Sequence, residues 1–177
     1  HTSIEAAITL ITQHKIAPKS IRSLQIGMPA EAMKTVFGRA MHNINVQDMV
    51  AANVVRGGLK LVDMPFPRIL SDPLYKQVRS RTTVAVDPEI NREFPDGRGG
   101  RVTITTNDGK VYSLRIDNPK GHSRRGEPSW DDLHGKWQGS LATCDVAQAI
   151  EIARKLDELP AAQRLFDAFA GVMKAPA

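Results

Sequence analysis

The 177-residue sequence predicts an α+β fold: an antiparallel sheet in a lid-like domain, with flanking helices and further C-terminal helices. Apolar residues recur at helical spacing near both ends of the chain, whereas β-branched residues alternate in its middle. The clearest local pattern is a β-hairpin over 102–116, in which Val102 and Ile104 alternate with threonines before a turn at 107–109. Strands and helices do not alternate regularly, so a parallel Rossmann-type sheet is not expected.

The first elements follow from a cap and from prolines. The order Thr2-Ser3-Ile4-Glu5 has the form of a capping box with Thr2 as the N-cap and Glu5 three residues later. The helix that it opens should end near Lys15, because a proline lies just beyond. Apolar and polar residues then alternate over 24–28 and predict a strand, which Pro29 ends.

Caps and stops also delimit the middle of the chain. Asn45 can cap a helix that Gly57 terminates, and Asp72 with the following proline opens a short one. Residues 82–86 are β-branched and predict a strand. Residues 88–100 are rich in proline and glycine and predict a loop.

The C-terminal third should be helical after a polar loop over 118–128. Ser129 can cap one helix, and Thr143 can begin another that Pro160 breaks. A last amphipathic helix is expected around 165–169.

Composition narrows the possible functions. The net charge is +5, but the basic residues are scattered and only two Trp and two Tyr can stack on bases, so we expect no nucleic-acid partner. No apolar run is long enough to span a membrane. The single cysteine, Cys144, excludes an internal disulfide framework and favours a cytoplasmic location. The histidines do not pair at metal-ligand spacing, so no metal site is expected.

Two places carry candidate chemistry. His1 lies just before a helix N-terminus, where an imidazole can bind a carboxylate or move a proton; the alternative is an ordinary surface histidine. The loop over 118–125 offers Lys120, Gly121, His122, Arg124 and Arg125, and such a loop can close on an anion. The alternative is a solvated basic loop.

Four stretches of the chain follow one another in an order that is more specific than any of them alone. They are residues 1–7, residues 46–57, the Asp72-Pro73 pair with the hairpin over 102–116, and residues 118–122 followed by Leu133 and Lys136. Together they resemble the MmgE/PrpD family, whose members include 2-methylcitrate dehydratases, cis-aconitate decarboxylases and iminodisuccinate epimerases. The resemblance implies a homodimeric enzyme without metal or organic cofactor, built from a large helical domain and a smaller α+β lid.

The resemblance assigns the chain to the lid and the helices that follow it. We expect residues 1–19 to form a helix at the junction with an N-terminal helical domain of the same protein, residues 20–127 to form the lid, and residues 128–177 to form C-terminal helices. His1 matches the family's active-site histidine. Asp48 stands where the family often has a tyrosine, and becomes a second candidate catalytic residue; the alternative is a first-turn carboxylate that complements the helix dipole.

These patterns together predict part of a lyase of the dehydratase type that acts on a small di- or tricarboxylate such as 2-methylcitrate. Proton abstraction beside a carboxylate, followed by elimination, requires a base and cations. In this hypothesis His1 and Asp48 are catalytic, and Lys120, Gly121, His122, Arg124 and Arg125 bind substrate. The isolated chain is expected to be inactive. A decarboxylase or epimerase of the same family and a non-catalytic binding domain remain alternatives.

Overall fold

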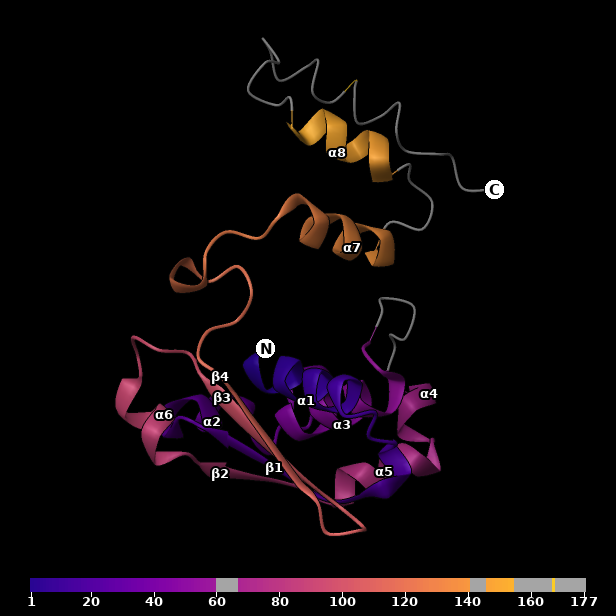
Figure 1. The fold of residues 1–177 in the computed structure, drawn as a ribbon, viewed down its shortest axis with the longest axis vertical. Coiled ribbons are helices and arrows are strands. Elements are labelled where there is room, and N and C mark those ends of the chain that lie inside the picture. The colour runs from indigo at the N-terminus through magenta and orange to yellow at the C-terminus, as the bar shows by residue number, and fades with distance from the viewer. Residues whose placement is uncertain (60–66, 141–145, 155–166, 168–177) are drawn as a thin grey trace. The chain divides into compact units, whose positions relative to one another are not determined.

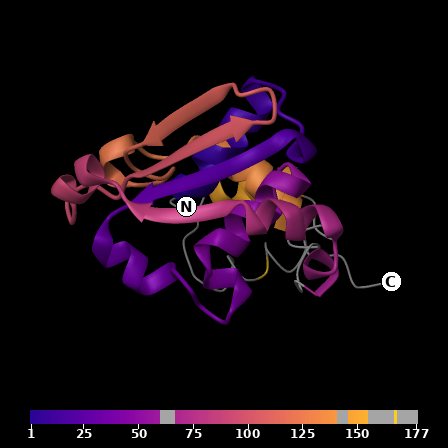
Figure 2. The same ribbon diagram turned by 90° about the horizontal axis from the view of Figure 1, so that it is seen from below.

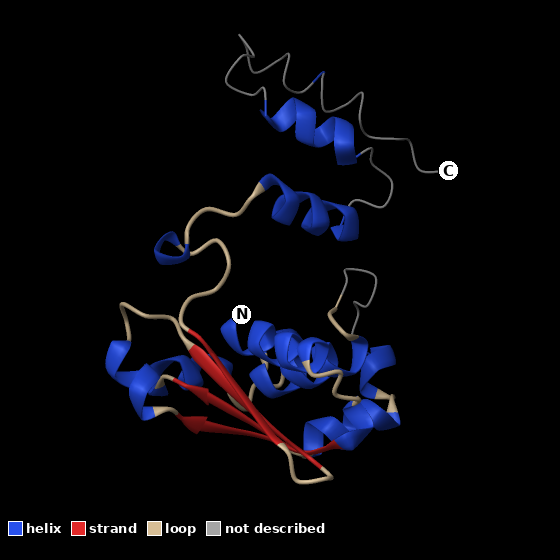
Figure 3. Cartoon of the chain, viewed as in Figure 1, coloured by secondary structure: helices blue, strands red, loops and turns tan. Residues whose placement is uncertain are grey.

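The computed structural model describes residues 1–59, 67–140, 146–154 and 167. The chain divides into two compact units, His1–Gly126 and Glu127–Ala177, which are treated separately below. Strands and helices are both present, so the predicted α+β class is confirmed (Figure 3).

The first unit is built on a four-stranded sheet with the order β2-β1-β3-β4 (Figure 2). Its strands are β1 (Ile21–Met28), β2 (Thr82–Val86), β3 (Gly100–Thr106) and β4 (Val111–Ile116). The predicted hairpin is confirmed as the antiparallel pair of β3 and β4, and β1 pairs antiparallel with β3. The edge strand β2 departs from the expected antiparallel arrangement, since it runs parallel to β1.

Helix α1 (Thr2–Gln13) begins one residue earlier than predicted, with His1 at the N-cap position and no side-chain cap. The capping box was therefore wrong. The Thr2 hydroxyl donates to the carbonyl of Arg98 at 3.3 Å, and the Glu5 carboxylate accepts from Arg125 instead of the cap backbone. Long-range partners thus replace the local bonds that the sequence suggested.

Three of the predicted caps and stops are confirmed. The Asn45 side chain accepts from two backbone N–H groups at the start of α3 (Val46–Arg56), which ends at Gly57 with φ of 67°. The Asp72 side chain caps α5 (Pro73–Ser80). Short pieces complete the unit, namely α4 (Pro67–Leu70) and the 3₁₀ turns η1 (Pro18–Ser20), η2 (His42–Ile44) and η4 (Ser123–Arg125).

Besides the short α4, two helices were not predicted. Helix α2 (Ala30–Val36) follows β1, and α6 (Pro88–Glu93) occupies the first half of the stretch predicted as a loop. Asp87 caps α6 by accepting from the N–H groups of Glu89 and Ile90, with Pro88 in the first turn. The prediction gave more weight to the later prolines and glycines than to this Asp-Pro start.

The core of the first unit lies between the sheet and the pair α1 and α3, which pack together on one face (Figure 1). Helix α1, which was expected at a junction with another domain, buries its alanines Ala6 and Ala7 completely within this core. Small residues on this face let helix and sheet approach closely. A Cβ on Gly100 would lie 2.7 Å from Thr2 Oγ1 and 2.8 Å from Ser3 Oγ, so this position admits no larger side chain without movement.

The second unit contains α7 (Trp130–Ser140) packed against α8 (Val146–Arg154). Ser129 caps α7 as predicted, because its hydroxyl accepts from the Asp132 N–H while its own N–H donates to the Asp132 carboxylate, both at 3.1 Å. Thr143, Pro160 and the helix expected around 165–169 lie outside the described residues. None of the described helices has both the length and the apolar character that crossing a bilayer requires.

Candidate functional site

An open cavity of about 800 Å³ lies beside the first turn of α1. Its walls come from the end of β1, from α2, from the η2 turn, from the start of α3 and from the segment before β3. The lining is mainly apolar, with Ile4, Met28, Val36 and Met49 among its residues. His1 lines the same cavity. An apolar chamber with a few polar groups is the usual form of a small-molecule site.

The backbone that carries His1 is held firmly. Its carbonyl accepts from the Glu5 N–H at 3.0 Å, which closes the first turn of α1. The hydroxyl of Thr2, the next residue, is bonded to the carbonyl of Arg98, and the start of β3 presses on the same turn at Gly100. The imidazole of His1 is itself exposed, so a fixed base presents a solvent-accessible side chain at the cavity.

Arg98 is a cationic residue of the lining, and sequence reasoning missed it. Its guanidinium carbon lies 5.8 Å from the centre of the Phe94 ring, which also lines the cavity. The backbone N–H of Arg98 donates to the Asn118 side chain at 3.3 Å. In the sequence Arg98 is one arginine in a glycine-rich stretch, and only the packing of β3 against α1 brings it close to the start of the helix.

Asp48 belongs to a different environment. It is 5% exposed, and its carboxylate accepts from the Arg79 guanidinium and contacts His42 Nδ1 at 2.6 Å. The hydroxyl of Tyr75 also reaches this carboxylate; burial first, and then the charge of Asp48, raise the pKa of Tyr75 to about 12. Asp48 is not part of the cavity lining, although Met49 is. The structure therefore does not bring the two candidate catalytic residues together.

The predicted binding loop belongs to the first unit and contacts α1. The Arg125 guanidinium forms a two-pronged contact with the Glu5 carboxylate, at 2.7 and 2.6 Å. His122 Nδ1 accepts from the Arg124 N–H at 3.2 Å, and Gly121 adopts a φ of 80° that suits glycine. The described lining of the His1 cavity includes none of the five candidate binding residues, which are Lys120, Gly121, His122, Arg124 and Arg125. The preceding residue, Pro119, does line it.

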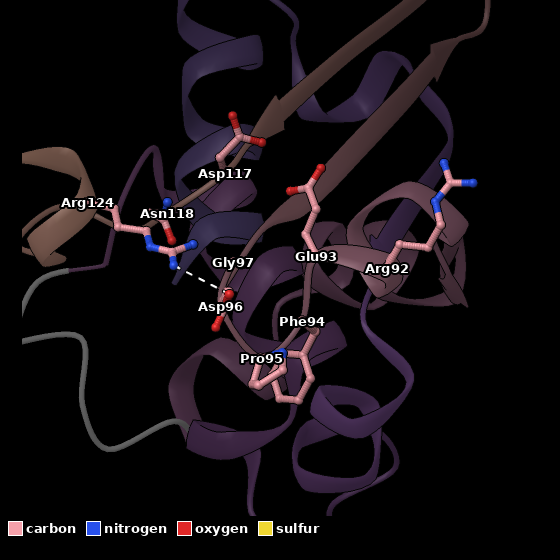
Figure 4. A pocket seen from close by; sticks show the side chains of 9 residues that line it. All are labelled: Arg92, Glu93, Phe94, Pro95, Asp96, Gly97, Asp117, Asn118 and Arg124. Carbon is pink, nitrogen blue, oxygen red and sulfur yellow. Dashed lines mark ion pairs between the residues drawn. The ribbon is translucent and has the colours of Figure 1, made fainter.

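Arg124 instead lines a second, smaller pocket of about 470 Å³ (Figure 4). It points toward Asp96, with 3.6 Å between the guanidinium and the carboxylate. Two other acids of this pocket, Glu93 and Asp117, pair with Arg115. The acids are thus largely neutralised within the protein. Among the described residues, no group of three His, Cys, Asp or Glu side chains is placed to hold a metal ion, and Cys144 lies outside that part.

Comparison with known proteins places these features in a family context. Residues 1–158 match the family model described as "MmgE/PrpD C-terminal domain". The chain is also 31% identical over 102 residues to a 2-methylcitrate dehydratase from Cupriavidus necator. That alignment covers 55% of this chain and 21% of the relative, so the matched part is about a fifth of the length of that curated protein.

Proposed function

The chain belongs to the MmgE/PrpD family, and on that premise we propose that it is the C-terminal portion of a dehydratase-type lyase acting on a small di- or tricarboxylate such as 2-methylcitrate. The observation that carries the proposal is that His1 and Arg98 both line one largely apolar cavity. A base and a cation that line the same cavity suit a substrate in which a proton leaves a carbon next to a carboxylate. The named activity of the relative from Cupriavidus necator supports the same reaction class.

The reaction requires a base, an acid and a charge to stabilise the intermediate. His1 takes the proton as the C–H bond breaks, because histidine as a residue type titrates near neutral pH. The electron pair left behind spreads onto the adjacent carboxylate, where a cation stabilises it. The C–O bond on the neighbouring carbon then breaks, the hydroxyl takes the proton back from protonated His1 and departs as water, and a carbon–carbon double bond forms.

The apolar walls contribute to this chemistry in two ways. Met28, Val36 and Met49 provide contacts for the carbon skeleton of the substrate. Apolar surroundings also strengthen the attraction between the carboxylates and the cations, since the local dielectric constant is lower than in water.

Asp48 has a positioning role in this proposal. Its contact with His42 ties the η2 turn to α3, and the next two residues of that turn, Asn43 and Ile44, line the cavity. Asn45 strengthens the connection, because its side-chain amide donates to the Arg39 carbonyl at 2.8 Å. The buried carboxylate therefore shapes one wall of the cavity without entering it.

The proposal extends to parts of the protein beyond this chain's cavity. An N-terminal helical domain completes the pocket, the enzyme is a cytoplasmic homodimer, and the loop with Lys120, Gly121, His122, Arg124 and Arg125 gates the site. Decarboxylation and epimerisation begin with related chemistry at the carbon beside a carboxylate. They differ from dehydration in what is lost, which is CO₂ in the first case and nothing in the second.

A direct test is turnover by the full-length protein. It is incubated with 2-methylcitrate, citrate and smaller dicarboxylates, and proton NMR follows the appearance of an unsaturated product, of CO₂ loss or of an inverted centre. We expect dehydration of at least one tricarboxylate, and no turnover by residues 1–177 alone. Absence of turnover with every carboxylate in the full-length protein contradicts the proposal and favours a binding domain.

A further inference from the structure

We propose that Arg98 is a specificity-determining residue that anchors one carboxylate of the substrate in the His1 cavity. This inference rests on the proposed function, because it assigns the carboxylate anchor of the same site. It differs from the sequence-based expectation, which placed substrate binding on the loop that ends at Arg125.

The backbone of Arg98 is bonded close to His1. The carbonyl of Arg98 accepts from the Thr2 hydroxyl, and its N–H donates to the Asn118 side chain, both at 3.3 Å. The backbone of Arg98 is thereby bonded on one side to the residue that follows His1. These bonds fix the backbone of Arg98 relative to the turn that follows His1, and good placement of substrate-binding groups relative to the reacting base is worth several orders of magnitude in rate.

Arg98 differs from the neighbouring arginines because the described residues give it no carboxylate partner. Neighbouring arginines are already neutralised, because Arg101 pairs with Asp87, Arg115 with Glu93 and Arg125 with Glu5. Within the described part of the chain, the Arg98 guanidinium contacts the face of the Phe94 ring. The one carboxylate in the described lining, Glu31, pairs with Lys34. Arg98 is thus a cavity cation for which the described residues supply no anion.

The contact with Phe94 leaves the N–H groups of the Arg98 guanidinium available. An aromatic ring contacts the flat face of a guanidinium and leaves the N–H groups at its edge available. Those N–H groups form a planar fork that matches the two oxygens of a carboxylate. The Phe94 ring, 5.8 Å from the guanidinium carbon, therefore attracts the charge of Arg98 without using its hydrogen-bond donors.

The test compares Arg98→Ala and Arg98→Lys with the wild-type full-length protein. Arg92→Ala is the matched control, since Arg92 is a nearby exposed arginine that lines the other pocket. We expect Arg98→Ala to raise KM for a tricarboxylate between about 10- and 100-fold, the range for losing a charge-assisted hydrogen-bonded contact. The expected change in kcat is smaller. Arg98→Lys should fall in between, because a lysine cannot form the two-pronged contact.

Binding of an unreactive ligand separates this inference from the proposed function. Tricarballylate carries three carboxylates and no hydroxyl to eliminate, and glutarate lacks the central carboxylate. If Arg98 holds the central carboxylate, calorimetry should show that Arg98→Ala weakens tricarballylate far more than glutarate, because only tricarballylate offers that group; if Arg98 holds a terminal carboxylate, both ligands should weaken alike.

The outcomes distinguish failure of the Arg98 anchor from failure of the lyase function. If the wild type binds tricarballylate, Arg98→Ala loses that binding and no carboxylate is turned over, Arg98 stands and the lyase function fails. If the wild type turns over substrate and Arg98→Ala matches Arg92→Ala in KM and in binding, the Arg98 anchor alone is overturned. If the wild type neither binds nor turns over any carboxylate, both are overturned.

Discussion

Two polar clusters in the first unit differ in whether their charged groups have partners within the protein. In the buried cluster, the Asp48 carboxylate contacts Arg79, His42 and Tyr75, so its charge has partners within the protein. In the cavity cluster, His1 and Arg98 face an open apolar chamber, and the described residues offer no carboxylate to Arg98. The first arrangement is what stability requires of a buried ion, and the second is what binding requires of a site.

The contrast shows why a charged residue is not by itself a functional one. Asp48 attracted attention in the sequence because of its position, yet its neighbours satisfy it. Arg98 attracted none, yet its neighbours leave its hydrogen-bonding edge available. The distinction depends on partners that are remote in sequence, such as Arg79 for Asp48, 31 residues away.

The largest expected effect is on stability at the buried cluster. Asp48→Ala leaves Arg79 without its anion and removes the contact to His42, which should lower the free energy of unfolding by about 3 kcal/mol. The value lies at the lower end of the range for broken buried pairs, because the Arg79 side chain is 30% exposed and can regain water. Urea denaturation of the first unit within the full-length protein measures it.

Asp117→Ala is the control for that measurement. Asp117 also pairs with an arginine, but it is 67% exposed, so its loss should change the free energy of unfolding by less than about 1 kcal/mol. If Asp48→Ala instead leaves stability unchanged and abolishes turnover, Asp48 is a catalytic residue and the contrast between the clusters is wrong.

The next effect is on turnover at the cavity cluster. In the full-length enzyme His1→Ala should lower kcat about 100-fold or more, the scale for losing an acid–base group, with little change in stability because the side chain is exposed. His14→Ala is the matched control at the other end of α1, where the histidine ring packs against Tyr112. Equal kcat values for the two variants remove His1 from the mechanism.

Much of the fold was predictable because its signals are local. The caps at Asn45, Asp72 and Ser129 and the turn of the hairpin each depend on neighbours within a few residues. The helix α6 was missed although Asp87 begins it, because prolines and glycines further along the same stretch favoured a loop.

The rest depended on contacts between distant residues. The parallel pairing of β2 with β1 joins strands more than fifty residues apart, and no local pattern specifies its direction. Thr2 gave up its capping role because Arg98 lies 96 residues away in sequence but within hydrogen-bond reach of it. The candidate site was therefore half predictable: His1 could be selected from the sequence, and Arg98 required the packing of β3 on α1.

The basic loop is intermediate between the two clusters, because its Arg125 is paired within the protein although the loop is proposed to gate the site. Arg125 is paired with Glu5, four residues after His1, so the loop is held against the same helix turn that carries the base. The double variant Arg124→Ala/Arg125→Ala should raise KM about tenfold and alter stability by less than about 1 kcal/mol, because the pair is partly exposed. Steady-state kinetics with urea denaturation measures both.

Glu5→Gln separates a gate from a solvated loop. If the ion pair to Arg125 holds the gate, this variant should reproduce most of the KM change without removing any cation. If the double arginine variant has wild-type kinetics with every carboxylate, the loop is a solvated basic segment and plays no part in binding.

The smallest effect concerns a satisfied charge near the cavity, at Asp87. Burial raises the pKa of Asp87, but hydrogen bonds from Arg101 and from the backbone N–H groups of Ile90 and Glu89 outweigh it and hold the pKa below its ordinary value. Asp87→Asn keeps a residue that caps helices well and removes the charge, so it should lower the free energy of unfolding by about 1 kcal/mol at neutral pH.

The pH dependence gives this last prediction its sign. A carboxylate whose pKa is lower in the folded than in the unfolded state stabilises the fold fully above the unfolded pKa, and that stabilisation is lost as the pH falls through the folded pKa. The difference in unfolding free energy between wild type and Asp87→Asn should therefore be constant from about pH 7 to about pH 5 and shrink below about pH 4. Urea titrations at several pH values measure it. A difference that stays constant into acid would mean that the charge of Asp87 contributes nothing, and that this pair, unlike the one at Asp48, is held only by its hydrogen bonds.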